Sequence, residues 1–467
     1  MIIINLVHLI IITLNIITHQ LIYYKGELFM SSLGNTMNEK VIPVIMKFVG
    51  MKGIVALKDG ILYTLPIIMV GSIFLLLAQI PYPPFNDWMA SMLGPGWTEP
   101  LFQAYNSSFA IIAMIAVVGI AYTYAKNEGF EPLSSGIIAL VVFLLTMNAF
   151  VVTKSGEVVS GVINKDLIGG KGMVTAIIIG LIVGAIYSWF MARKITIKMP
   201  AGVPQGVANS FAALIPAAVI ITGATVVYAV LKYGMNTTFI ELIYTVIQTP
   251  LQGISDSLGG ALFMSFLIPF LWWFGVHGST IVSGVMTGIL TSNTLENQAI
   301  LQSGKALTVE NGGHIVTQQF LDNFVSMTGA GVTIGLVLCM MILGKSAQSK
   351  ELGKLAVVPA CFNINEPVTF GTPIVMNPFM AIPFIITPMV TSLITYLSIA
   401  SGLVPLFTGV MVPWTTPPVI SGLILGGPRM ALLQIVIMAI SFFIYLPFFK
   451  KQDAINLANE KAANGEN

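Results

Sequence analysis

The feature that most limits the possible folds is a series of long apolar segments in the first half of the chain. Each runs for about 17 to 22 residues, and a helix of that length, rising about 1.5 Å per residue, crosses a hydrocarbon core about 30 Å thick. The whole chain is 56% hydrophobic and 9% charged, whereas soluble domains are about 25% charged. We therefore predict an all-α polytopic membrane protein, because β-barrel strands would show about ten residues of alternating pattern. The expected spans are residues 61–80, 109–125, 132–152, 173–192 and 211–231.

A second feature, the stretch from residue 361 to residue 378, is incompatible with an ordinary membrane helix. Pro367, Pro373 and Pro378 interrupt the backbone hydrogen-bond ladder at short intervals. Glu366 lies among them, and no Lys or Arg occurs between positions 355 and 427. At membrane depth, a carboxylate and a broken backbone both require a partner or a water-filled cavity. The stretch therefore predicts a binding site inside a membrane protein; the alternative is a surface loop that happens to contain an acid.

The start of the chain allows three interpretations. Residues 1–22 are apolar, but they lack a basic flank and a small-residue cleavage site, so they make a poor signal peptide. They are either an extra span or, in the hypothesis we prefer, translated upstream sequence. The tripeptide Lys-Gly-Glu at positions 25–27 is encoded by AAAGGAGAA in one codon choice, which looks like a bacterial ribosome-binding site. This predicts that residues 1–29 are not native and that translation starts at Met30.

The remainder of the chain divides near residue 235. Residues 30–235 show regular apolar helices, which suits a scaffold, and residues 236–450 show apolar runs interrupted by polar and helix-breaking clusters, which suits a substrate domain. Residues 451–467 are polar, and we expect this tail to fray. Three shorter features are also expected: interfacial amphipathic helices at 41–60 and 235–253, and a small hairpin at 158–170.

Basic residues predict the orientation. Lysines at positions 40–58 precede the first span, three basic residues at 193–198 follow the fourth, and the loop 81–100 has none. By the positive-inside rule, the Met30 end lies inside. Lys450 and Lys451 place the other end inside as well, which requires an even number of spans, and we expect ten. The lysines at 154, 165 and 171 argue the other way.

Several polar and aromatic side chains of the second half are candidates for a site. His277 is costly at membrane depth, and the glycines at 275 and 278 permit a ligand to approach the backbone. Asn363 and Asn365 alternate with an isoleucine, so in an extended segment both amides share one face and suit a polyhydroxyl ligand. The alternatives are a histidine bonded to a helix carbonyl and asparagines that only break a helix.

A tryptophan in this half can have one of two roles. Its flat ring can pack against the apolar face of a sugar in a pocket, or it can belong to the belt of aromatic residues at the membrane interface. We favour the pocket for Trp273 and Trp414, and less so for Trp272. The acids at 241, 256, 296 and 322 are expected near helix ends without a functional role. No phosphate-binding loop, dinucleotide fingerprint or metal-ligand cluster occurs, and Cys339 and Cys361 have no metal spacing. We expect no cofactor and no metal, and a net charge of +2 does not suggest nucleic acid.

Four segments together carry a highly specific resemblance. They are 273–278 (Trp-Phe-Gly-Val-His-Gly), 362–371 (Phe-Asn-Ile-Asn-Glu-Pro-Val-Thr-Phe-Gly), 377–380 (Asn-Pro-Phe-Met) and 413–418 (Pro-Trp-Thr-Thr-Pro-Pro). They resemble the membrane (IIC) component of the bacterial phosphoenolpyruvate-dependent sugar phosphotransferase system, in its lactose/cellobiose/diacetylchitobiose family. Residues 56–60 and 197–204 also fit, and the similarity extends from residue 30 to about residue 450.

The resemblance implies a homodimer of ten-span subunits in the bacterial inner membrane, with the first five spans forming the dimer scaffold. It implies a mobile second half with two re-entrant hairpins, at about 277–300 and 355–378. The substrate would be a disaccharide, phosphorylated on its 6-hydroxyl during import by a phosphocysteine of a cytoplasmic IIB protein that works with IIA. This chain shows no added soluble domain, so we expect IIB to be a separate polypeptide.

By the family pattern, Glu366 and His277 lie at the 6-hydroxyl and act in catalysis. A carboxylate accepts the proton of the attacking hydroxyl, and an imidazole orients it. The residues expected to bind substrate are Asn363, Asn365, Trp273, Gly278, Trp414 and Thr415.

Two other classes of function are alternatives to sugar phosphotransfer. In an ion-coupled secondary transporter, Glu366 would be a proton or sodium site. A membrane-bound structural protein explains neither the buried acid nor the broken helices. The sequence leaves open which β-linked disaccharide is carried, since cellobiose and diacetylchitobiose differ only in acetamido groups.

Overall fold

The computed structural model describes residues 42–80, 83–153, 155–200, 202–372, 374–375 and 377–463. Most of them are helical, and the strands within these ranges form one antiparallel pair, β1 (Phe150–Val152) with β2 (Val158–Ser160). The helices of the first half are α3 (Ile42–Val49), α4 (Lys52–Ile61), η2 (Leu62–Thr64), α5 (Leu65–Ala78), α6 (Pro83–Leu93), α7 (Glu99–Asn106), η3 (Phe109–Ile111), α8 (Ile112–Asn127), α9 (Pro132–Leu145), α10 (Lys165–Ile168), η4 (Gly170–Gly172), α11 (Met173–Ala192), α12 (Gln205–Ala212) and α13 (Leu214–Met235).

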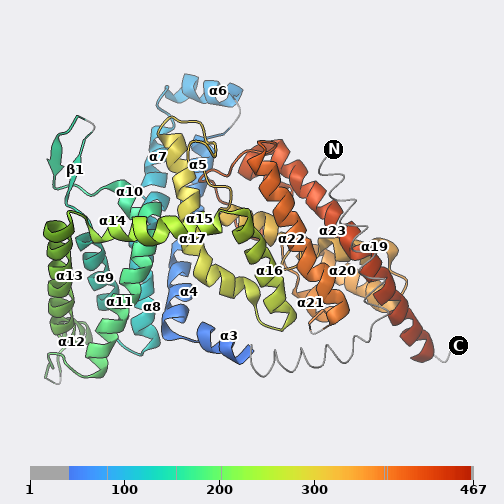
Figure 1. The fold of residues 1–467 in the computed structure, drawn as a ribbon, viewed down its shortest axis with the longest axis horizontal. Helices are drawn as coiled ribbons and strands as arrows, with labels where there is room; N and C mark the ends of the chain where they lie inside the picture. The colour runs from blue at the N-terminus through green and yellow to red at the C-terminus, as the bar shows by residue number, and fades with distance from the viewer. Residues whose placement is uncertain are drawn as a thin grey trace.

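The second half stands beside the first (Figure 1). The helices of this half are α14 (Phe239–Ile243), η5 (Tyr244–Gln248), α15 (Thr249–Ser255), α16 (Leu258–Trp273), α17 (Gly278–Gln302), α18 (Gln318–Phe320), η6 (Leu321–Val325), α19 (Ile334–Leu343), α20 (Ala347–Cys361), α21 (Glu366–Gly371), α22 (Pro378–Ala400) and α23 (Ile420–Ala463). In Figure 1 the stretch from α14 to α15 runs across the molecule. It leads from the group containing α9, α11 and α13 toward the group containing α16 and α19 to α23.

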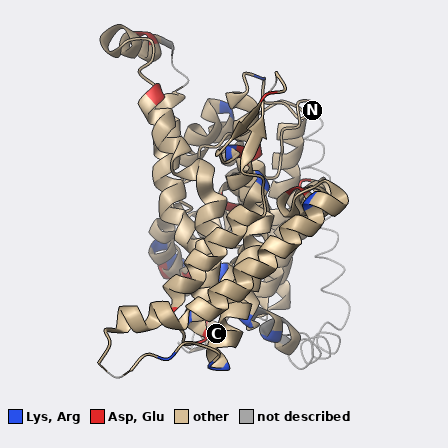
Figure 2. Cartoon of the chain, turned by 90° about the vertical axis from the view of Figure 1, so that its left-hand side faces the viewer, with Lys and Arg blue, Asp and Glu red and all other residues tan. Residues whose placement is uncertain are grey.

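Six helical stretches among the described residues are long and apolar enough to cross a membrane, and a bent pair adds a seventh candidate. The pair, Phe239–Ser255 and Leu258–Trp273, bends by 73°. Each of the five predicted segments of the first half contains a helix, but the predicted span 132–152 is helical only to Leu145, and its residues 150–152 form strand β1. In Figure 2, coloured charged residues interrupt the mostly tan helices only sparsely. The total of ten spans remains a prediction. The six stretches are Lys52–Ala78, Glu99–Asn127, Gly170–Ala192, Gln205–Met235, Pro378–Ala400 and Ile420–Ala463.

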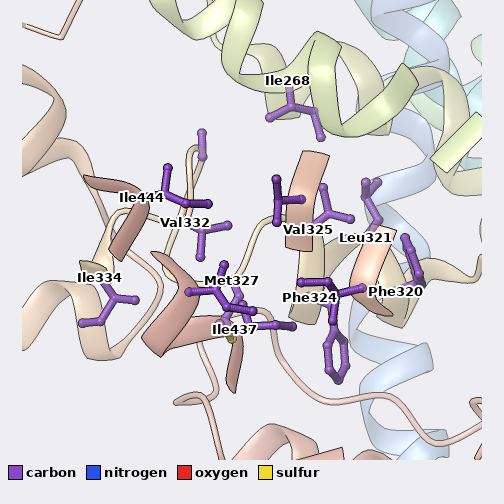
Figure 3. Packing of buried hydrophobic residues seen from close by; sticks show 14 of the residues in the cluster. Ile268, Phe320, Leu321, Phe324, Val325, Met327, Val332, Ile334, Ile437 and Ile444 are labelled. Carbon is purple, nitrogen blue, oxygen red and sulfur yellow. The ribbon is translucent and has the colours of Figure 1, made fainter. Parts of the chain in front are cut away.

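Small residues let the helices of the first half pack closely. A Cβ on Gly60 of α4 would collide with the backbone of Ile120 in α8, and one on Gly119 would collide with Gly60 itself. Such close backbone approach gives van der Waals contact that lipid cannot provide, which is how membrane helices associate. The main core of the second half is formed by its own residues from Ala261 to Phe449, part of which Figure 3 shows.

Four sequence-based expectations differ from the structure. Residues 52–60 are not interfacial, because α4 continues through η2 into the first span. The strand pair lies at 150–160 rather than 158–170. Residues 278–302 form one helix, so the first hairpin is α16 and α17 around a turn at 274–277. The tail is helical to Ala463, since the carboxylates of Asp453 and Glu460 on α23 accept N–H groups at the start of α20. The predicted start at Met30 lies outside the described residues.

Candidate functional site at two hairpin tips

The first hairpin turns between α16 and α17. The chain reverses at Gly275, whose φ of +79° lies in the left-handed region that glycine adopts without strain. The N–H of Val276 bonds to the carbonyl of Leu271 over 3.0 Å, and the N–H of Gly275 bonds to that of Trp272 over 2.9 Å. These two bonds make a Schellman motif, which ends α16 and aims the next residues back along the hairpin.

His277 is the N-cap of α17. Its Nδ1 accepts the backbone N–H of Thr280 over 3.2 Å and lies 2.8 Å from the Thr280 hydroxyl. A backbone N–H can only donate, so Nδ1 carries no proton here and the neutral ring has its hydrogen on Nε2. The side chain is exposed. His277 therefore offers a hydrogen-bond donor, rather than a base, to a group outside the tip.

The residues that flank His277 have different environments. Gly278 is buried, and a Cβ there would collide with the Ile268 carbonyl of α16, so this glycine lets the two arms of the hairpin meet. The ring of Trp272 lies 4.4 Å from the His277 ring, between centroids. Both tryptophan side chains are buried, and Trp273 donates its Nε1–H to the carbonyl of Asn377 over 3.0 Å. The structure thus brings Trp272, the tryptophan we favoured less, to the histidine.

The second hairpin, between α20 and α21, ends in the same motif. Asn363 has a φ of +63°, the N–H of Ile364 bonds to the carbonyl of Pro359 over 3.0 Å, and the N–H of Asn363 bonds to that of Ala360 over 3.1 Å. Asparagine is the residue that most often replaces glycine in this conformation. The arm α20 starts at Ala347, somewhat before the predicted 355.

The amides of Asn363 and Asn365 both meet the same backbone segment, although the tip is a turn and not the extended segment that the shared-face prediction assumed. The N–H of Thr328 donates to the Asn363 Oδ1 over 2.6 Å, and the Asn365 Nδ2 donates to the carbonyl of Ala330 over 2.6 Å. The Asn363 Nδ2 also donates to the carbonyl of Thr416 over 3.0 Å and to that of Trp414. Both of its amide hydrogens are therefore used by backbone, and the 414–416 loop is fastened to the hairpin tip.

Glu366 begins α21, directly after the Asn365 cap, and is exposed. Among the described residues, no group hydrogen-bonds to its carboxylate or pairs with it. Phe370 lies one helical turn later, so it shares a face with Glu366. The Phe370 ring is 6.3 Å from that of Trp272, which itself contacts His277.

The two hairpin tips therefore meet through this aromatic pair, with the acid on one side and the imidazole on the other. A second contact supports this arrangement, since a Cβ on Gly275 would lie 3.7 Å from the Val375 side chain. Trp414 is 55% exposed and Thr415 is half-buried, in the loop that Asn363 holds. Figure 1 draws the end of α16 beside α21.

Sequence reasoning missed the segment that supports the second tip, residues 326–333. Thr328 and Val332 have φ values of +59° and +50°, and the glycines at 329 and 331 are also positive. Such backbone is costly for a branched residue and persists only when its surroundings fix it. Here the Tyr445 hydroxyl donates to the carbonyl of Gly331 and the Ser441 hydroxyl donates to that of Val332. The Thr-Gly-Ala-Gly run inside an apolar stretch was the available signal.

The spanning helices and the paired hairpins define a polytopic membrane transport protein. The sequence profile of the family "Phosphotransferase system, EIIC" matches residues 58–388, which is more than half of the chain. The chain belongs to this family, the membrane components that import sugars in the phosphotransferase system. The resemblance drawn from the four motifs is thereby confirmed.

Known relatives cover nearly the whole chain. The putative permease IIC component YwbA of Bacillus subtilis (strain 168) is 39% identical over 93% of this chain and 98% of its own length. The cellobiose-specific EIIC component of Geobacillus stearothermophilus is 38% identical over 91% and 95%. The crystal structure of the transporter ChbC, the IIC component of an N,N'-diacetylchitobiose-specific system, superposes with a TM-score of 0.86 at 38% identity, covering 91% of this chain and 99% of that one.

Proposed function

We propose that this chain imports a β-linked disaccharide of the cellobiose or diacetylchitobiose type and presents its 6-hydroxyl for phosphorylation by a separate cytoplasmic IIB protein, which IIA recharges. The observation that carries the proposal is the arrangement of the two hairpin tips. An exposed carboxylate, Glu366, and an imidazole N–H donor, His277, flank one aromatic contact. The relatives named for cellobiose and diacetylchitobiose support this substrate class.

Glu366 and His277 divide the chemistry between them. The sugar O6 attacks the phosphorus of the IIB phosphocysteine, so an O–P bond forms, the P–S bond breaks and the thiolate leaves. The Glu366 carboxylate takes the O6 proton, since a free hydroxyl is a poor nucleophile. The His277 Nε2–H holds the O6 lone pair in position, a role that its acceptor-type Nδ1 favours.

The other predicted site residues fall into two groups in this proposal. Trp414 and Thr415 bind the sugar, because they are accessible beside the second tip. Trp272 is a positioning residue for His277, because its ring contacts the imidazole and is 6% exposed. Trp273 is equally buried and holds the Asn377 carbonyl. Asn363 is a positioning residue because its amide already holds three backbone groups, and Asn365 keeps one amide hydrogen for the sugar. Gly278 acts through hairpin packing.

At the scale of the whole chain, residues 30–235 form the scaffold and dimer interface, and residues 236–450 form the moving substrate domain. The two main cores support this division, since one is formed by second-half residues alone and the other mostly by first-half residues, with Ile240, Leu295, Val410 and Met411 added from the second half. Both termini lie in the cytoplasm, which the basic residues of the loops favour.

The test is the chemical form of the imported sugar. Vesicles that contain this chain and phosphorylated IIB are expected to accumulate disaccharide 6-phosphate, and vesicles with unphosphorylated IIB are expected to accumulate none. Free sugar concentrated by a proton or sodium gradient alone would instead identify an ion-coupled transporter.

A further inference from the structure

The strongest unassigned feature is an imidazole held between two carboxylates, far from the hairpin tips. The His314 Nδ1 lies 2.9 Å from the Asp256 Oδ2, and its Nε2 lies 3.0 Å from the Glu296 Oε2. All three side chains are between 16% and 20% exposed. Both ring nitrogens have an anionic partner, so both act as donors and the ring is an imidazolium.

These three residues, called the clamp below, join the two arms of the first hairpin at their base. Asp256 lies at the 73° bend immediately before α16, and Glu296 lies near the end of α17. They are therefore at the base of the two arms whose other ends carry Trp272 and His277. Glu296 is 19 residues from His277 along one helix, which corresponds to about 28 Å at 1.5 Å per residue.

The loop that carries His314 is hydrogen-bonded to both arms of the first hairpin. Asn297 of α17 accepts the His314 N–H over 2.7 Å and donates to its carbonyl over 2.9 Å. The Val316 N–H donates to the Asp256 Oδ1 over 2.6 Å, and the Asn293 amide donates to the Val316 carbonyl over 2.7 Å. The clamp is thus a continuous set of bonds from α17 through the loop to the start of α16.

The clamp is also connected to the first half of the chain. Gln252 donates to the Glu296 Oε1 over 2.9 Å and to the Ser292 hydroxyl over 3.2 Å. The Ser292 hydroxyl and the Gln248 amide both donate to the carbonyl of Gly170, over 2.8 and 3.0 Å. A Cβ on Gly170 would approach the α17 backbone at Ser292 to 3.1 Å, so the two halves touch closely at this point.

We propose that Asp256, His314 and Glu296 are positioning residues for phosphoryl transfer. This ion-paired clamp fixes the angle between the arms of the first hairpin. It thereby sets the position of His277 and Trp272 against Glu366. The inference rests on the proposed function. A small rotation at the base displaces a tip about 28 Å away by a distance that catalysis tolerates poorly.

The charge state of the clamp follows from its surroundings. Burial alone would lower the pKa of His314, but the hydrogen bonds and negative charges of Asp256 and Glu296 raise it to about 9. Nearby titratable groups are Tyr244, which faces Glu296, and Tyr396, which faces Asp256, and Lys171 lies over the Tyr244 ring at 5.8 Å. The clamp is therefore closed at neutral pH. As the pH rises through about 9 the ring becomes neutral, so the clamp loses its positive charge and one of its two hydrogen bonds to carboxylate.

The test compares His314→Gln with Glu310→Gln, an exposed acid of the same loop that serves as the matched control. Affinities for cellobiose and N,N'-diacetylchitobiose are measured on purified protein from pH 6.5 to 10. For wild type and Glu310→Gln we expect a constant affinity up to about pH 8 and a fall of about tenfold through pH 9, the scale of one lost charge-assisted hydrogen bond. For His314→Gln we expect the weaker affinity at every pH and no step. Asp256→Asn is expected to keep the step at a lower pH.

Identical affinities and an identical step in wild type and His314→Gln would overturn the inference. If His314→Gln fails to fold, Asp256→Asn decides, because an unmoved step contradicts the proposal. If neither sugar binds wild-type protein, the proposed substrate class fails. The clamp is then tested by the maleimide labelling rate of Ser279→Cys at the tip, in a background without Cys339 and Cys361. We expect His314→Gln to change that rate and Glu310→Gln to leave it unchanged, and equal rates in all three would overturn the inference.

Discussion

Replacement of Asn363 separates a positioning role from direct sugar binding. The side chain makes three hydrogen bonds to backbone groups, from Thr328 and to Trp414 and Thr416, at a φ of +63°. At about 1 kcal/mol net for each bond, Asn363→Ala loses about 3 kcal/mol, and placing alanine in the left-handed region adds about 1 to 2 kcal/mol. Asn363→Gly is the matched control, because it loses the bonds but escapes most of the backbone strain.

The assay is thermal unfolding in detergent combined with sugar affinity on the folded fraction. We expect both variants to unfold at lower temperature than wild type, Asn363→Ala more so than Asn363→Gly, with sugar affinity falling in parallel as the second tip and the 414–416 loop separate. Wild-type stability in both variants, together with a large loss of sugar affinity, would refute the reasoning and make Asn363 a direct ligand contact.

Three further predictions concern the whole chain. Crosslinks between subunits are expected to map to residues 61–235, and crosslinks confined to the hairpin stretches 258–302 and 347–371 would contradict the division into scaffold and substrate domain. A cysteine pair at Val174 and Ile243, which pack in one apolar cluster, is expected to block transport while sugar binding persists, and undiminished transport in the locked protein would argue against a moving second half. The pKa of His314 rises on folding from about 6.5 to about 9, so its stabilising contribution is complete below pH 6.5 and is lost as the pH rises through 9. Raising the pH from 7 to 10 is therefore expected to lower the unfolding temperature of wild type more than that of His314→Gln, by the equivalent of about 3 kcal/mol at most. Equal shifts in the two proteins would contradict this prediction.

Much of the architecture is predictable from local pattern. Apolar length alone located helices at all five expected spans of the first half, and the acid among prolines located the second hairpin. The amides of Asn363 and Asn365 do come together, but not for the reason that their alternation gives, because Asn363 is in the left-handed region and Asn365 is not extended. What these amides contact depends on residues 328–330, whose place beside the tip is a tertiary property.

Other features could not be predicted from local pattern, for physical reasons. Trp272 and Trp273 differ by about 100° around a helix, so the one that meets His277 is decided by how the Gly275 turn ends α16. Residues 278–302 look broken because the helix carries buried Thr, Ser and Asn, yet side chains such as those of Asn293 and Thr294 find partners and the backbone stays helical. Asp256, Glu296 and His314 are distant in sequence, and the two acids look like ordinary helix-end residues, so only the fold assembles the clamp.

The most direct test of the central claim is Glu366→Gln, assayed for sugar affinity and for IIB-dependent phosphoryl transfer on the same purified preparation. Glutamine keeps the shape and most of the hydrogen bonding, but it cannot take the O6 proton, and general-base assistance is typically worth about 10²- to 10⁴-fold. We expect affinity to fall by about tenfold at most and phosphoryl transfer at saturating sugar to fall by at least about a hundredfold. Near-normal phosphorylation by Glu366→Gln at saturating sugar would contradict the account and leave Glu366 as a ligand contact only.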